Sequence, residues 1–175
     1  MFRRLIPVFA FALIAAACSG SGGDADTYLD DAAAITSGYE TAAAAIFTDY
    51  LAALDAATAE DGDAVFASAN QELFGGLADE FGSAVAAIED LTPPGDAEDQ
   101  HDAWLAAARA LNDVFQSTSG QLSTLTDGLA VNEVISQLPL GDLQSAYRSS
   151  CQAVAAALTA ETTSAIACEP PSDSS

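Results

Sequence analysis

A long segment near the start of the chain repeats its apolar side chains at helical spacing, and this pattern restricts the fold more than any other feature. From Tyr28 to Leu54, an apolar residue recurs every three or four positions, and the charged residues fall outside this stripe. The stripe consists of Tyr28, Ala32, Ile35, Tyr39, Ala43, Ile46, Tyr50 and Leu54. Because an α-helix completes a turn in about 3.6 residues, this spacing predicts an amphipathic helix with one buried face.

Three tyrosines of this stripe, Tyr28, Tyr39 and Tyr50, are eleven residues apart. Eleven residues are close to three full helical turns, so the three rings share one face of the predicted helix. Such a row either packs into a helical core or forms an aromatic strip that faces a ligand. We interpret it as core packing.

Three further segments carry the same periodicity, namely residues 66–88, 104–125 and 143–158. Pro93, Pro94 and Gly95 separate the second segment from the third, and Pro139 and Gly141 precede the fourth. Four amphipathic helices with short connections predict an all-α fold, an antiparallel four-helix bundle over residues 27–168. Two adjacent glycines at 75 and 76 lie inside the second segment and indicate either a kink or a close helix crossing.

The charge of the chain limits its partners. Its 175 residues include 26 acidic residues against four arginines and no lysine, which gives a formal net charge of −22. Neutralising a phosphate backbone takes clustered Lys and Arg, so the charge argues against nucleic-acid binding. It equally disfavours adsorption on an anionic membrane surface. The absence of lysine excludes Schiff-base chemistry.

The first residues have the order of a secretory leader. Arg3 and Arg4 precede a thirteen-residue uncharged stretch, Leu5 to Ala17, which is too short to span a bilayer. It ends in Ile14-Ala15-Ala16-Ala17-Cys18, which resembles the lipobox of bacterial lipoproteins, with Ala15 where leucine is more common. The alternative is an ordinary signal peptide that is cleaved near Ala17, with Cys18 incidental.

The resemblance implies that residues 1–17 are a cleaved signal peptide and that Cys18 is lipidated. The mature protein would then sit in the cell envelope, anchored by its N-terminal lipid on the extracytoplasmic side of a bacterial membrane. Residues 18–26, rich in Gly and Ser, have the composition of a flexible tether. Removing Arg3 and Arg4 leaves two arginines against 26 acidic residues, a formal charge of −24.

Two other cysteines, Cys151 and Cys168, form an even pair for an oxidising compartment. One continuous helix would hold them ~25 Å apart, which is too far for a disulfide. We therefore predict that the chain turns back near residues 160–164, so that a disulfide fastens the C-terminal tail to the fourth helix, and that residues 169–175 are disordered. The alternative is two free thiols.

The sequence offers little for catalysis. His101 is the only histidine, and Glu98 with His101 makes one Glu-x-x-His motif, whereas a di-iron bundle needs two. The pairs Asp24/Asp26 and Asp61/Asp63 begin like calcium loops but do not continue as such loops do. We predict no catalytic residue, no metal site and no cofactor.

One connection is more apolar than a loop requires. Within residues 129–140, four residues share a helical face, namely Val131, Val134, Ile135 and Leu138. This short helix either closes the open end of the bundle or lines a groove for a small apolar ligand or a partner helix. The sequence favours a non-catalytic interaction module, with an envelope protein as its partner. The alternative is a protein that binds a small ligand or a divalent cation.

Overall fold

The computed structural model describes residues 24–58, 60–158, 166 and 168, and its described part is all-helical. The predicted signal peptide, Cys18, the tether up to residue 23 and the tail 169–175 lie outside these residues. The described elements are α1 (Ala25–Asp55), α2 (Gly62–Glu89), the 3-10 helix η1 (Gly95–Ala97), α3 (Glu98–Leu122), α4 (Gly128–Ser136) and α5 (Leu140–Leu158).

Helix α1 begins where a side chain can satisfy its first free backbone amides. Asp24 has extended backbone angles, and its carboxylate accepts a hydrogen bond from the Asp26 backbone N–H at 3.2 Å. The helix therefore includes two residues that we expected in the tether. Tyr28, Ala32 and Ala43 of the predicted stripe are buried, and the stripe's other five residues are half-buried.

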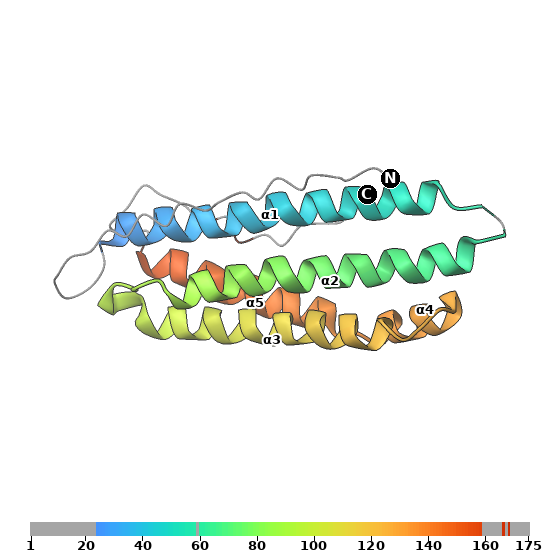
Figure 1. Cartoon of the computed structure of the whole chain (residues 1–175). Helices are drawn as coiled ribbons and strands as arrows, with labels where there is room; N and C mark the ends of the chain where they lie inside the picture. Colours follow the sequence, from blue (N-terminus) through green and yellow to red (C-terminus); the bar gives the residue numbers. More distant parts are fainter. Residues whose placement is uncertain (1–23, 59, 159–165, 167, 169–175) are drawn as a thin grey trace.

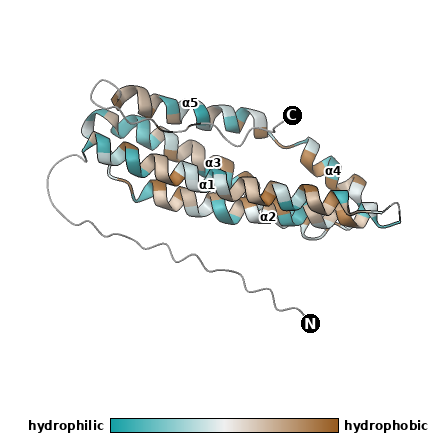
Figure 2. Ribbon diagram, turned by 90° about the horizontal axis from the view of Figure 1, so that it is seen from above, coloured by the Kyte–Doolittle hydropathy of each residue, from teal (hydrophilic) through white to brown (hydrophobic). Residues whose placement is uncertain are grey.

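The helices pack into a bundle in which neighbours in sequence are largely neighbours in space. Helix α1 packs on α2, α2 on α3, and α3 on α5, while the short α4 lies against α2 and α3 (Figure 1). The end of the bundle where α1 begins is called the Ala25 end below, and the opposite end is called the α4 end. Helix α4 occupies that opposite end, beyond the start of α5 (Figure 2).

The two central glycines of α2 mark a close helix crossing. A methyl group at Gly76 would lie 3.1 Å from Ile46 Cδ1 of α1, whereas one at Gly75 would lie 3.5 Å from Ser119 Oγ of α3. The missing side chain at Gly76 thus lets α1 approach α2 closely, as the close crossing predicts, whereas a methyl group at Gly75 would make only an ordinary contact. The same shortage of bulk explains how an alanine-rich chain closes its core.

Aromatic rings fill the space where the helices meet. Phe81 of α2 packs against Tyr39 of α1, Phe115 of α3 and Tyr147 of α5, with ring centroids 4.7–5.8 Å apart. One ring therefore joins four helices, a geometry typical of favourable aromatic contacts. Tyr39 belongs to the tyrosine row, and its packing confirms the core interpretation at this position.

The predicted disulfide between Cys151 and Cys168 is present. The two Cα atoms lie 5.6 Å apart, and both residues are buried, as is Ile166. Helix α5 ends at Leu158, so the chain leaves the helical path before Cys168, as the disulfide requires. The predicted turn at residues 160–164 lies outside the described residues.

Candidate functional site

The predicted apolar segment forms α4, and its first turn is fixed by a cap. Asp127 accepts a hydrogen bond from the Ala130 backbone N–H at 3.0 Å. Gly128 lies against α2, because a methyl group there would be 3.1 Å from Asp63 Oδ1 and 3.5 Å from the Phe66 ring. Helix α4 is thereby held on the first turns of α2.

The four residues that we expected to share one face of this segment separate into different roles. Val131 is fully buried and packs into the core, as the end-closing interpretation predicts. Val134 and Leu138 are half-buried and line a groove. Ile135 also packs against the core but does not line that groove. One part of the segment therefore closes the core, while another part lines a groove.

The groove lies between the end of α3 and α4 and has a volume of ≈ 460 Å³. Its lining consists of Gln121, Leu125, Ala130, Glu133, Val134, Gln137 and Leu138. The α3 wall is fixed from α2, since the Gln71 side-chain amide donates to the backbone carbonyls of Leu122 and Leu125 at 2.7 and 2.8 Å. The groove is therefore partly apolar, and hydrogen bonds from α2 hold its α3 wall in place.

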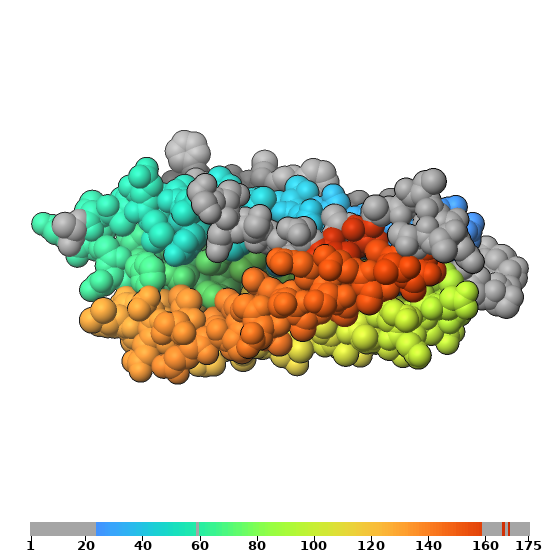
Figure 3. Space-filling view, turned by 180° about the vertical axis from the view of Figure 1, so that it is seen from behind, coloured from blue at the N-terminus to red at the C-terminus, as the bar shows by residue number. Residues whose placement is uncertain are grey.

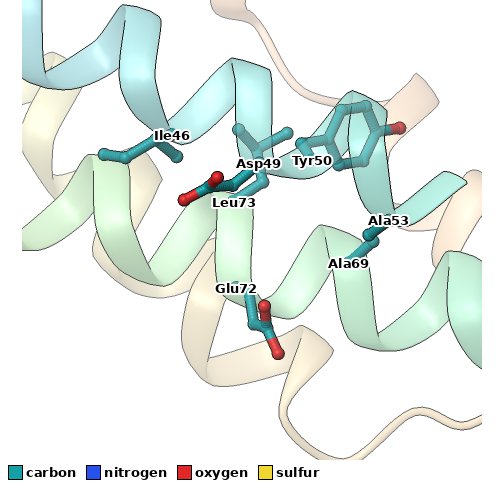
Figure 4. Close-up of a pocket in the computed structure, with 7 residues that line it drawn as sticks. All are labelled: Ile46, Asp49, Tyr50, Ala53, Ala69, Glu72 and Leu73. Atoms are coloured by element: carbon teal, nitrogen blue, oxygen red, sulfur yellow. The ribbon is translucent and has the colours of Figure 1, made fainter. Parts of the chain in front are cut away.

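A second, smaller pocket of ≈ 210 Å³ lies between α1 and α2, near the α4 end (Figure 4). Its lining residues are Ile46, Asp49, Tyr50 and Ala53 of α1 with Ala69, Glu72 and Leu73 of α2. This pocket was not predicted from the sequence, because the whole tyrosine row was interpreted as core packing. The lengths of the periodic segments could have indicated it: the fourth segment, residues 143–158, is much shorter than the first, residues 28–54, and cannot cover the whole of that first helix.

At the Ala25 end, the polar aromatic groups are buried and joined to one another. The Tyr28 hydroxyl and His101 Nδ1 share a hydrogen bond of 2.9 Å between α1 and α3. The His101 ring is 4% exposed and lies edge-on to Trp104, whose indole is fully buried against Tyr147. These contacts connect α1, α3 and α5.

Burial sets the protonation of this cluster. It lowers the pKa of His101, an effect that the nearby Asp102 carboxylate partly opposes, and it raises the pKa of Tyr28 to about 12. Burial likewise raises the pKa of Tyr147 to about 12, and the nearby Trp104 indole opposes part of this rise. The Trp104 indole nitrogen itself makes no hydrogen bond, so burial is the main cause. Burial therefore favours the uncharged forms of His101, Tyr28 and Tyr147, as is usual for side chains in a protein core.

The two aspartate pairs that resemble the start of calcium loops have local structural roles. Asp24 caps α1, and Asp61 accepts hydrogen bonds from the Thr58 N–H and hydroxyl, both at 2.7 Å, which lower the pKa of Asp61. The described residues contain no cluster of three or more His, Cys, Asp or Glu placed to hold a metal ion. Likewise, none of the described helices is long and apolar enough to cross a membrane.

Comparisons of this chain with protein-family models, with curated proteins and with solved structures found no match.

Proposed function

We propose that the chain is a bacterial lipoprotein, anchored through Cys18 on the extracytoplasmic side of a membrane, whose helical bundle is a non-catalytic interaction module for an envelope protein. The lipobox-like sequence at residues 14–18 supports the anchor. In the same proposal α1, α2, α3 and α5 form an antiparallel four-helix bundle, which the helix order and the short connections favour.

The short segment between Cys18 and α1 limits how far the Ala25 end of the proposed module lies from its lipid anchor. Ala25 begins α1 only seven residues after Cys18, and seven extended residues reach ~25 Å at most. The Ala25 end would therefore stay close to the lipid. Helix α1 has 31 residues and extends ~46 Å at 1.5 Å per residue, so the α4 end lies that far along the bundle from the end that the tether holds near the lipid.

The observation that carries the interaction proposal is the position of exposed apolar surface. Among the described residues, the large apolar side chains that are exposed are Leu51, at 62%, and Leu129, at 79%. Leu51 lies in the last turns of α1 and Leu129 in the first turn of α4, so both belong to the α4 end, as do the groove and the pocket. The exposed leucines, the groove and the pocket thus lie at one end of the bundle, and we place the proposed contact surface there.

The anchor is tested by replacing the lipidated sulfur. Cys18→Ser should abolish incorporation of labelled palmitate and release the protein from the membrane fraction, while a Cys151→Ser variant should stay membrane-bound. Continued membrane fractionation and labelling of Cys18→Ser would refute the anchor.

The module is tested by photo-crosslinking in intact cells. A photoreactive residue in place of Leu129 should give one discrete crosslinked band, whereas the same residue at Ala34, which is exposed on α1 toward the Ala25 end, should give none. Equal crosslinking from the two positions would remove the basis for an interaction surface at the α4 end.

A second candidate function is favoured by the α3–α4 groove, since ≈ 460 Å³ lies within the ~300–1,000 Å³ typical of small-molecule sites. In this alternative the groove binds a small apolar ligand. A thermal shift that saturates with one compound, and that Leu138→Asp removes while Ser136→Asp preserves it, would support ligand binding; an unchanged shift in Leu138→Asp would exclude the groove.

A further inference from the structure

The second half of α1 has an apolar face that the rest of the bundle covers incompletely. Within α1, which the structure describes in full, Ala43 is the last buried residue. Five larger apolar side chains follow it and are half-buried or exposed, namely Ile46, Phe47, Tyr50, Leu51 and Leu54. A helix normally buries such a stripe against a neighbour.

The lengths of the helices explain the gap. Helix α5 has 19 residues against 31 in α1, and the chain between α3 and α5 is taken up by α4, which packs on α2 and α3. In the space-filling view, part of α2 remains visible between α1 and α4 toward the α4 end (Figure 3). Among the helices that the structure describes, α2 is therefore the one on which the second half of α1 packs.

A pocket opens at this incompletely covered face. Ile46, Tyr50 and Ala53 of α1 face Ala69 and Leu73 of α2 across it, so its walls are mostly apolar (Figure 4). Its ≈ 210 Å³ is smaller than the ~300–1,000 Å³ of typical small-molecule sites. A space of this size suits an apolar side chain of a protein partner, the kind of anchor on which interfaces depend.

The charges at the pocket define the chemistry of that partner. Asp49 of α1 and Glu72 of α2 both line the pocket and both are exposed, and the Glu72 carboxylate points away from α1 (Figure 4). A second copy of this chain, with a formal charge of −22, would bring further acidic groups to this place. Like charges placed together disfavour such a contact, whereas Lys or Arg beside the anchor would complement it.

We propose that this pocket between α1 and α2 binds a basic amphipathic helix of a partner protein. One apolar side chain of that helix enters the space between Tyr50 and Leu73, and its Lys or Arg side chains pair with Asp49 and Glu72. The inference rests on the proposed function in taking the bundle as an interaction module, but it does not depend on the lipid anchor.

The test uses the purified full chain in a nonionic detergent and a fluorescent helical peptide of Leu and Lys with Leu at i, i+3, i+4 and i+7. A peptide of the same pattern with Glu in place of Lys is the charge control. The Lys peptide should bind saturably, as followed by anisotropy against a blank of detergent alone, and the Glu peptide should not bind.

Two variants separate a specific site from general attraction to an acidic protein. Ala53→Phe, which fills the pocket from a half-buried position, should weaken peptide binding at least ~tenfold. Asp49→Asn with Glu72→Gln should weaken it about three- to tenfold. The matched control, Asp79→Asn with Glu80→Gln, removes the same charge from exposed positions of α2 outside the pocket and should change little.

Equal weakening by the pocket pair and the control pair would overturn the proposal, because the attraction would then be general. Unchanged binding to Ala53→Phe, with an unchanged circular dichroism melt, would overturn it as well. Self-association through Leu51 that the Lys peptide fails to compete would assign the face to a second copy. A photo-crosslink from Leu129 in cells together with no peptide binding would leave the interaction module standing and remove only this partner.

Discussion

The two ends of the bundle treat their aromatic and apolar side chains differently. At the Ala25 end, Tyr28, His101, Trp104 and Tyr147 are buried and connect three helices. At the α4 end, Tyr50 of the same tyrosine row is only half-buried, and Leu51 is exposed. The disulfide lies beyond the middle of α5, in the same part of the fold as Trp104 and Tyr147. This difference indicates that the Ala25 end contributes more to the stability of the fold, whereas the described part of the α4 end leaves apolar side chains exposed.

The largest expected effect comes from an aromatic truncation at each end. Trp104→Ala should cost about 3–5 kcal/mol of unfolding free energy, because it empties a fully buried site, whereas Tyr50→Ala should cost about 1 kcal/mol. Denaturant titrations of the two variants measure the difference. Equal costs would mean that the two ends share the stability of the fold.

The disulfide is the next largest contribution. It closes a loop with a sequence separation of 17, so removing it with the double variant Cys151→Ser, Cys168→Ser should lower the unfolding free energy by about 3 kcal/mol. A reductant should lower the denaturation midpoint of the parent protein but leave that of the variant unchanged. An equal denaturation midpoint for parent and variant would show that the disulfide does not contribute to the stability of the fold.

The glycine at the α1–α2 crossing should respond in the opposite direction to a glycine in open space. Gly38→Ala meets no atom within 4 Å and should raise stability by roughly 0.5–1 kcal/mol through helix propensity. Gly76→Ala would press on three atoms of Ile46, a stiff β-branched side chain, and should lower stability by ~1 kcal/mol. Thermal melts of the two variants check the sign. Stabilisation by both would show that α1 is loosely held at the crossing.

The smallest effect is a pH dependence from His101. Because burial lowers the pKa of His101 in the folded protein, the unfolded chain binds more protons in the acid range. The contribution of neutral His101 is full above pH ~6.5 and is lost progressively as the pH falls through its folded pKa. His101→Gln should therefore flatten the loss of stability between pH 7 and 5, as measured by denaturation midpoints. A parallel pH profile in both proteins would contradict this assignment.

Several elements of this fold could be predicted from local sequence. The stripe from Tyr28 to Leu54 predicts α1 because helical spacing of apolar residues is a property of the segment itself. The Cys151–Cys168 disulfide also followed from counting and reach. The hydrogen bonds of Asp61 could not be predicted in this way, because the sequence does not reveal that the Thr58 backbone N–H and hydroxyl donate to its carboxylate.

Identical sequence signals acquired different roles through their neighbours. Tyr39 and Tyr50 occupy equivalent places in the eleven-residue repeat, yet Tyr39 packs on Phe81 while Tyr50 lines a pocket. Val131 and Val134 lie in one short helix, yet Val131 is buried and Val134 lines the groove. These differences depend on which helix lies opposite, and no periodicity within a segment records that.

The sequence by itself determined the helical character of the chain and its acidic charge, because these depend on spacing and composition. It predicted the Cys151–Cys168 disulfide but left two free thiols as the alternative, and the tertiary structure decided between them. Only the tertiary structure decided which part of each apolar stripe is covered. Helix α5 is shorter than α1 and packs on α3, so the second half of α1 keeps α2 as its neighbour and leaves Tyr50 beside an open pocket. Whether a side chain is buried depends on the helix that packs against it as well as on the residue itself. Which helix packs there depends on how helices of unequal length align in the bundle.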